Sequence, residues 1–264
     1  MDSNQDINIV VVGSGNVAEA LAHLFATTAG ISLRQLYARN AERGRAIATT
    51  VGTEWTDDAA SLAEADIYLI AVSDRAVKSV ATVLPFSPHA VVAHTAGSIP
   101  ITAIPEREGG RGVFYPLQSF TSGRSEAIEG APIFIEGDSA ETTAKLRNLA
   151  NRLGLKAEEA NSERRRRLHL AGVFVNNFVN HLYTIASDII AEEGFDFATL
   201  KPIIRETAAK AIASGDPRNV QTGPAVRGDE EVTARHLAML ANDETKQLIY
   251  KYLTQSIWET SKKI

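Results

Sequence analysis

The chain has 264 residues, of which 44% are hydrophobic and 22% charged, a composition typical of a globular protein and not of a disordered one. The formal net charge of −5 argues against nucleic acid as a partner, because binding phosphates requires a basic face. No run of residues reads as a membrane span, no cysteine is present, and the six histidines form no metal-ligand motif, so we expect a cytoplasmic protein with no membrane contact and no metal site.

The first predicted elements are a strand, a tight turn and a helix. The apolar residues 7–12 predict a buried strand, and apolar side chains then recur at helical spacing up to Phe25. The turn between them has glycines where a dinucleotide-binding βαβ unit needs a tight bend and an open approach for a pyrophosphate at the helix start. We therefore expect a dinucleotide to contact Gly13, Ser14, Gly15, Asn16 and Val17. The alternative is a glycine-rich turn in a doubly wound fold that binds no nucleotide.

Residues 31–39 predict the second strand, whose end contacts the adenosine ribose in this kind of unit. An acidic residue there would bind the ribose 2′-hydroxyl, but the chain has Arg39 and Asn40, which favour NADP over NAD. Arg43 and Arg45, on the predicted helix that follows, either extend this phosphate site or form the solvated face of a surface helix.

Strands and helices alternate up to residue 161. Strands are predicted at 52–56, 66–74, 89–100, 111–120, 131–137 and 155–161, and helices at 41–52, 58–65, 75–84 and 139–153. The alternation predicts an α/β domain of residues 1–161 with a doubly wound, mostly parallel Rossmann sheet. Since ligands bind at the carboxyl ends of such strands, Val72 and Ser73 should lie beside the cofactor, and Asp74 should cap the next helix.

Two further strand ends carry small and polar residues suited to a small-molecule substrate held close to a nicotinamide ring. The predicted substrate contacts are Thr95, Gly97, Ser98 and Gln118, and the catalytic candidates are His94 and Tyr115. A histidine at a strand end is also often a satisfied rim residue, and both readings of His94 stay open.

Residues 162–264 contain no convincing strand and predict an all-helical C-terminal domain. Helices are predicted at 162–193, 197–214, 229–241 and 243–261, with a structureless loop at 214–229. The four arginines at 164–167 are expected to be solvated or to meet acidic partners, with phosphate contact as the other reading.

A polar stripe runs along the first of these helices. At 100° per residue, His169, Asn176, Asn180 and Ser187 fall close to one line. We expect His169 and Asn176 to form a wall of the active site, and the rest of the stripe to meet the same site, neighbouring helices or a second subunit.

The segments GSGNVA, HTAGS, YPLQSF and TGPAVRGD together resemble the Rossmann-like NADP oxidoreductases that carry the C-terminal domain of unknown function 2520. These proteins are similar in fold to pyrroline-5-carboxylate reductase, ketopantoate reductase and the 3-hydroxyacid dehydrogenases. The resemblance implies a homodimer formed through the helical domain, with a cleft between the domains. Whether the 214–229 loop would act in its own subunit or in the partner stays open.

One departure from these relatives bears on mechanism. The 3-hydroxyacid dehydrogenases have a catalytic lysine three residues before an Asn-Asn pair, and here Val173 stands there, before Asn176 and Asn177. The first hypothesis is therefore an NADP(H)-dependent oxidoreductase that transfers hydride to a small carbonyl or imine, with His169 or Tyr115 as proton donor and Asn176 and Gln118 orienting the substrate. The alternative is a non-catalytic NADP(H)-binding sensor or scaffold dimer.

Overall fold

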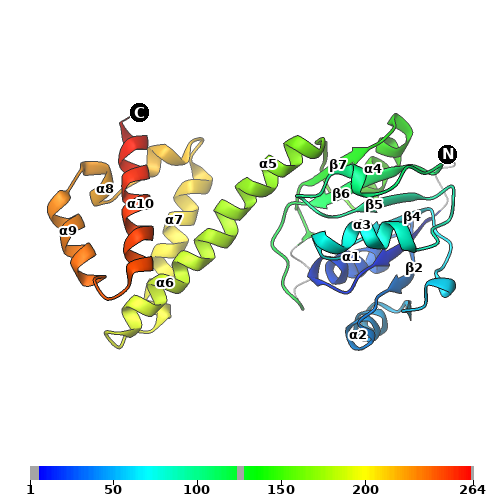
Figure 1. The fold of residues 1–264 in the computed structure, drawn as a ribbon, viewed down its shortest axis with the longest axis horizontal. Helices are drawn as coiled ribbons and strands as arrows, with labels where there is room; N and C mark the ends of the chain where they lie inside the picture. Colours follow the sequence, from blue (N-terminus) through cyan, green and yellow to red (C-terminus); the bar gives the residue numbers. More distant parts are fainter. Residues whose placement is uncertain (1–5, 124–127, 263–264) are drawn as a thin grey trace. The chain divides into compact units, whose positions relative to one another are not determined.

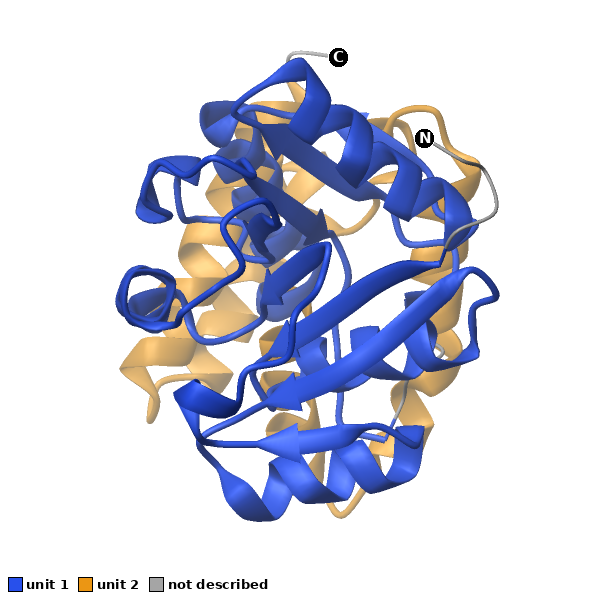
Figure 2. Ribbon diagram, turned by 90° about the vertical axis from the view of Figure 1, so that its right-hand side faces the viewer, with its two compact units in different colours: residues 1–178 blue, residues 179–264 orange. Residues whose placement is uncertain are grey.

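The computed structural model describes residues 6–123 and 128–262. The chain divides into two compact units, Met1–Phe178 and Val179–Ile264 (Figure 2). The sequence placed the domain boundary at 161/162, where helix α5 (Ser162–Gly172) begins. In the described part of the chain, no helix is long and apolar enough to cross a membrane.

The first unit is built on one eight-stranded sheet (Figure 1). Its strand order is β3-β2-β1-β4-β5-β6-β7-β8, and every neighbouring pair is parallel except β6 with β7. The order reverses between β1 and β4, which is the point at which doubly wound sheets bind ligands. The predicted α/β fold is confirmed. The strands are β1 (Ile7–Val12), β2 (Ile31–Tyr37), β3 (Glu54–Thr56), β4 (Ile67–Ile70), β5 (Val91–His94), β6 (Arg111–Pro116), β7 (Ile133–Gly137) and β8 (Ala157–Glu159).

Helices cover both faces of this sheet because the central strands are apolar on both sides. In β1, Ile9 and Val11 join the core under α1 (Asn16–Thr27), α2 (Ala41–Val51) and α4 (Ala140–Arg152). The alternate residues Val10 and Val12 join the core under α3 (Asp74–Val83). This burial on two faces explains why the sequence predicts β1 and β4 so clearly.

Two local expectations in this unit are wrong. The predicted helix 58–65 is only the 3₁₀ turn η1 (Ala59–Ser61), since the Asp58 carboxylate accepts bonds from the Ala60 amide and the Ser61 hydroxyl and closes a tighter turn. Asp74 does not cap α3 either, because the capping position belongs to Ser73 and Asp74 is already inside the helix.

The predicted long helix contains a widened segment. α5 runs from Ser162 to Gly172, a π-helix (η4) occupies Val173–Phe178, and α6 (Val179–Ala191) follows in the second unit. A π-helix is wider than an α-helix, so side chains beyond it leave the line that a 100° spacing predicts.

The second unit contains only helices in its described residues. They are α6, η5 (Phe197–Leu200), α7 (Lys201–Ala213), η6 (Pro217–Val220), α8 (Pro224–Arg227), α9 (Glu230–Met239) and α10 (Glu244–Ser261). The prediction of a structureless loop at 214–229 is wrong, because η6 and α8 lie within it. In both, a proline stands in the first turn, where its missing N–H costs nothing.

Candidate active site

A cavity of about 990 Å³ lies at the carboxyl ends of the central strands, within the first unit. The glycine turn after β1 and the ends of β2 and β4 form one part of its lining, and residues after β5 and β6 form another. From the helix that follows β8 come His169, Asn176 and Asn177. The cavity therefore brings together the predicted cofactor residues and most of the predicted substrate residues.

The turn after β1 has the geometry that a pyrophosphate needs. Gly13 has φ +134°, and a Cβ there would overlap the carbonyl oxygen of Ala71 at the end of β4, so only glycine fits. A Cβ on Gly15 would meet no atom within 4 Å. Gly15 therefore leaves an open approach to the backbone at the start of α1, the position at which Rossmann units hold a pyrophosphate.

Two of the helices that start at this cavity begin without a capping side chain. The starts of α1 and α3, at Gly15 and Ser73, have no capping side chain, whereas Asn40, Ser139 and Asn161 cap α2, α4 and α5. Uncapped amide groups and the positive dipole end of a helix favour an anion. The residues present thus fit a dinucleotide phosphate.

The arginines at the end of β2 and on α2 make different contacts. Arg39 is exposed and lines the cavity beside Asn40, whose side chain caps α2 through the Arg43 amide at 3.0 Å. Arg45 stacks on Trp55, 4.6 Å from its ring centre. The Arg43 guanidinium is bonded to Asn16 and Glu19, so Arg39 is the cation best placed for a 2′-phosphate.

Tyr115 and His169 meet at the substrate side of the cavity. The Tyr115 hydroxyl lies 3.1 Å from His169 Nδ1, and the ring planes are inclined by 68°, with centres 6.1 Å apart. A Cβ on Gly97 would lie 2.7 Å from His169 Nδ1 and 2.8 Å from Tyr115 Cζ. Burial raises the pKa of Tyr115 to about 12, so its hydroxyl keeps its proton at neutral pH.

His94 occupies a different environment from the one a proton donor needs. It is the last residue of β5, fully buried, and absent from the cavity lining. Its Nδ1 accepts a bond from the Ala96 amide at 3.1 Å, and Nε2 lies 3.4 Å from the Pro100 carbonyl oxygen. Burial, assisted by the charge of Arg165, lowers its pKa to about 4. The geometry favours the rim-residue reading over catalysis.

Of the four predicted substrate contacts, three line the cavity and one does not. Thr95, Gly97 and Gln118 line the cavity, although the Thr95 hydroxyl is also 3.5 Å from the Ile70 carbonyl oxygen. Ser98 does not line the cavity, and its hydroxyl donates to the carboxylate of Asp74. Asp74 itself lines the cavity, a role that the sequence reasoning missed.

The part of the polar stripe that lies in the first unit contributes to the cavity. Asn176 and Asn177 lie within the π-helix, and both line the cavity. His169, seven residues before Asn176, lines it too. Asn180, His181 and Ser187 belong to the second unit. Val173, at the position of the dehydrogenase lysine, is the first residue of the π-helix.

A buried ion pair behind the site was not expected from the sequence. Arg165, within the arginine run predicted to be solvated, is fully buried and paired with Glu136 of β7. Its Nη2 also donates to the Ile99 carbonyl oxygen at 2.5 Å, and the Ser162 hydroxyl donates to Glu136 at 2.9 Å. The pair joins α5 to the sheet. The sequence carried one signal of this ion pair, which is that Glu136 is the only acidic residue of the predicted strand APIFIEG.

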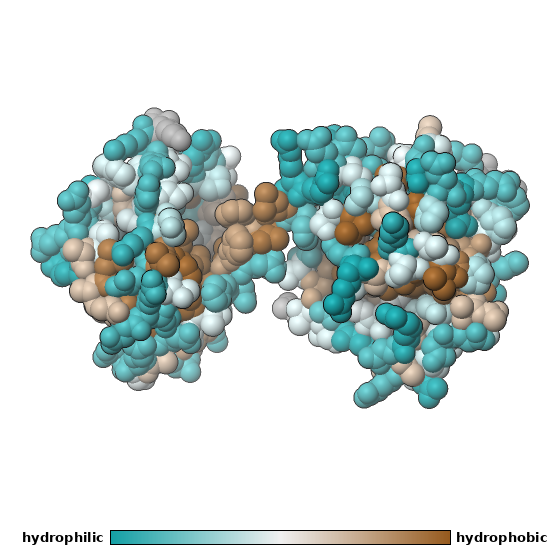
Figure 3. Space-filling view, viewed as in Figure 1, coloured by the Kyte–Doolittle hydropathy of each residue, from teal (hydrophilic) through white to brown (hydrophobic). Residues whose placement is uncertain are grey.

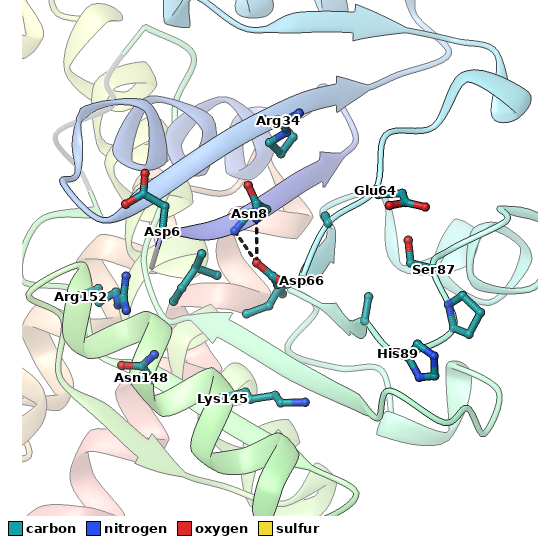
Figure 4. A pocket seen from close by; sticks show the side chains of 15 residues that line it. Asp6, Asn8, Arg34, Glu64, Asp66, Ser87, His89, Lys145, Asn148 and Arg152 are labelled. Carbon is teal, nitrogen blue, oxygen red and sulfur yellow. Dashed lines mark hydrogen bonds between the residues drawn. The ribbon is translucent and has the colours of Figure 1, made fainter. Parts of the chain in front are cut away.

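A second cavity, of about 750 Å³, lies at the opposite edge of the sheet (Figure 4). Its floor holds Asn8 and Asp66, joined by two hydrogen bonds of 2.8 and 3.1 Å. His89 and Lys145 on its walls are paired with Glu108 and Glu141. Both side chains therefore have partners within the protein.

Comparisons with known proteins give the family. Residues 8–97 match the family described as NADP oxidoreductase, coenzyme F420-dependent, and residues 131–257 match the domain of unknown function DUF2520. A crystal structure of a proposed NADP oxidoreductase from Bacteroides fragilis is 38% identical over 96% of this chain and 98% of that one, with a TM-score of 0.89. This chain belongs to the DUF2520-containing NADP oxidoreductase family.

More distant structures share the fold of this family. A Thermotoga maritima protein is 21% identical, covering 97% of this chain and 98% of its own, with a TM-score of 0.72. A reductive aminase from Aspergillus terreus, solved with NADPH, is 15% identical over 96% and 93% of the two chains, with a TM-score of 0.68. No curated protein sequence matches the chain.

The two family matches divide the cavity residues between them. The glycine turn and Arg39 fall in the NADP oxidoreductase match, and His169 and Asn176 fall in the DUF2520 match. Tyr115 lies between the two matched segments. The site of this DUF2520 family member is therefore assembled from both segments and from the strand that links them.

Proposed function

We propose that this protein is an NADPH-dependent reductase that delivers a hydride to the carbon of a small carbonyl or imine substrate. The observation that carries the proposal is one cavity that joins an uncapped, glycine-lined phosphate site to the Tyr115–His169 pair. Membership of an NADP oxidoreductase family supports it. Bound NADPH would supply the hydride, held by the start of α1 with Arg39 facing the 2′-phosphate.

The residues of the cavity have distinct roles in this proposal. Hydride addition to a carbonyl leaves an alkoxide, which is a stronger base than tyrosinate, so Tyr115 can give up its hydroxyl proton despite its raised pKa. His169, hydrogen-bonded to that hydroxyl, would return the proton to it. Asn176 and Gln118, which both line the cavity, would orient the substrate oxygen or carboxylate.

An imine fits the same site without a strong acid. A protonated imine carries its proton into the site, so hydride addition gives the amine directly and no residue has to protonate the product. This suits a chain with Val173 at the lysine position. Pyrroline-5-carboxylate reductases of the same fold are named for a cyclic imine that they reduce, and reductive aminases for a reaction that forms an amine. Cyclic imines are therefore among the candidate substrates.

Substrate screening tests the proposal. NADPH oxidation is followed with 2-oxoacids, cyclic imines, oxoesters and an oxidised deazaflavin, using wild type and Tyr115→Phe. We expect turnover of one class, and a loss of about 100-fold in kcat with an unchanged NADPH dissociation constant in the variant for a carbonyl substrate. Tight NADPH binding with no turnover of any class, and no effect of substitutions at Tyr115 and His169, would favour the sensor hypothesis.

We also infer that the protein works as a homodimer formed through its second unit. Among the described residues of that unit, Ala225 is the only buried one, while Ile212 is 85% exposed and Met239 79% exposed. Figure 3 shows hydrophobic side chains gathered over the middle of the helical segment formed by α5, η4 and α6, which leads into this unit. An apolar surface of this kind requires a partner. Light scattering should give twice the chain mass, and a monomer at micromolar concentration would contradict the inference.

A further inference from the structure

The segment after β6, residues 117–123, is a wall of the active-site cavity that has no helix or strand of its own. Gln118, Ser119 and Phe120 line the cavity. The Leu117 amide donates to the Pro132 carbonyl oxygen at 3.1 Å, and beyond this backbone bond a loop of this kind is held in place by side chains or by the ligand it contacts. The contacts that hold this wall in place therefore help to set the shape of the substrate side of the cavity.

Leu117 and Phe120 of the segment pack against hydrophobic clusters, and side-chain hydrogen bonds to it come from the first turn of α1. Asn16 Nδ2 donates to the Phe120 carbonyl oxygen at 2.9 Å. Glu19 accepts from the Ser122 hydroxyl at 3.0 Å and from the Gly123 amide at 3.3 Å. The same turn of helix thus borders the phosphate site on one side and holds the substrate wall on the other.

Arg43 of α2 completes this arrangement. Its Nη2 lies 2.7 Å from Asn16 Oδ1 and 3.0 Å from Glu19 Oε2. The Glu19 side chain is only 18% exposed, and the Arg43 side chain 37%. A carboxylate near the start of α1 would oppose the binding of a pyrophosphate there, and the guanidinium neutralises it.

We propose that Asn16, Glu19 and Arg43 form a positioning cluster that fixes the 117–123 wall and keeps the start of α1 receptive to an anion. The proposal rests on the proposed function, and it assigns Arg43 a role that does not involve the 2′-phosphate. The cluster therefore affects the pyrophosphate, which NADPH and NADH share. Arg39 affects the 2′-phosphate, which only NADPH has.

Charge substitutions separate this role from direct phosphate contact. In Arg43→Ala, an unneutralised Glu19 should weaken NADPH and NADH binding by the same factor, about twofold to fivefold, and leave the preference between them unchanged. Adding Glu19→Gln to Arg43→Ala should restore both affinities, because the opposing charge is gone. Arg45→Ala, on the same helix but stacked on Trp55, is the matched control and should leave both affinities unchanged.

Hydrogen–deuterium exchange tests the wall without any nucleotide. Peptides that contain the Gly123 amide should exchange faster in Glu19→Ala and Arg43→Ala than in wild type or Arg45→Ala. Unchanged exchange would overturn the cluster. A loss of NADPH binding alone in Arg43→Ala, with NADH binding intact, would also overturn it and make Arg43 a 2′-phosphate ligand. A wild type that binds neither dinucleotide would refute the proposed function, and the exchange result would still decide the cluster.

Discussion

Replacing Gly97 by alanine adds one methyl group at the point where the two candidate catalytic side chains meet. The new Cβ would lie 2.7 Å from His169 Nδ1, 2.9 Å from His169 Cβ and 2.8 Å from Tyr115 Cζ, all well inside van der Waals contact. Gly97 is not among the glycines with positive φ, so the backbone itself accepts alanine. The cost should therefore come from separating the Tyr115–His169 pair, and overpacking of this kind costs about 1–3 kcal/mol.

Gly15→Ala is the matched control, because the same methyl group would there meet no atom within 4 Å. Urea unfolding should show the loss of about 1–3 kcal/mol in Gly97→Ala and a loss below about 1 kcal/mol in Gly15→Ala. Calorimetry should show the reverse order for NADPH, with binding weakened about tenfold or more only in Gly15→Ala, since its methyl group occupies the pyrophosphate approach. Wild-type stability in Gly97→Ala, with the 3.1 Å contact between Tyr115 and His169 retained in its crystal structure, would refute the reasoning.

Three further substitutions test separate parts of the account. Because the pKa of His94 is lowered from 6.5 to about 4, its neutral form contributes stability that is complete above pH 6.5 and is lost as the pH falls toward 4, by up to about 3 kcal/mol. In urea unfolding, the free energy of unfolding of His94→Gln should therefore depend less steeply on pH over this range than that of the wild type. An equally steep pH dependence would contradict the assignment. Arg39→Asp should remove the preference for NADPH over NADH in calorimetric titrations, and an unchanged preference would place the 2′-phosphate elsewhere. Arg165→Met leaves Glu136 without its cation and should lower the free energy of unfolding in urea by about 3–5 kcal/mol. The double variant Arg165→Met/Glu136→Leu should recover part of this loss. Equal stability of the wild type and the single variant would refute a structural role for the pair.

The parts of the molecule that the sequence predicts well are those fixed by local pattern. β1 and β4 are apolar on both faces, and the glycine turn follows β1 directly, so the strands and the turn follow from a short window of sequence. His94 shows the limit of this reasoning. It pairs with Ile70 and Val113 inside the sheet, whereas the residues after it turn into the cavity. A difference of one residue in where a strand ends therefore decides whether a side chain lies in the core or in the site.

Contacts between distant parts of the chain explain the other differences. Arg165 looks solvated beside three other arginines, yet its partner Glu136 lies 29 residues earlier, and only the fold brings them together. The π-helix at Val173–Phe178 cannot be predicted from a spacing of 100° per residue, since that spacing assumes a regular α-helix. Glu19 is similar, because its partner Gly123 lies 104 residues away.

A crystal structure of the protein with NADP bound is the most direct measurement of the central claim, that one cavity holds both the cofactor and the proton-donating pair. We expect the pyrophosphate at the start of α1, the 2′-phosphate at Arg39, and the nicotinamide ring beside Tyr115, His169 and Asn176 with room for one small substrate. A nicotinamide ring that lies outside this cavity, or a pyrophosphate bound away from Gly15, would contradict it.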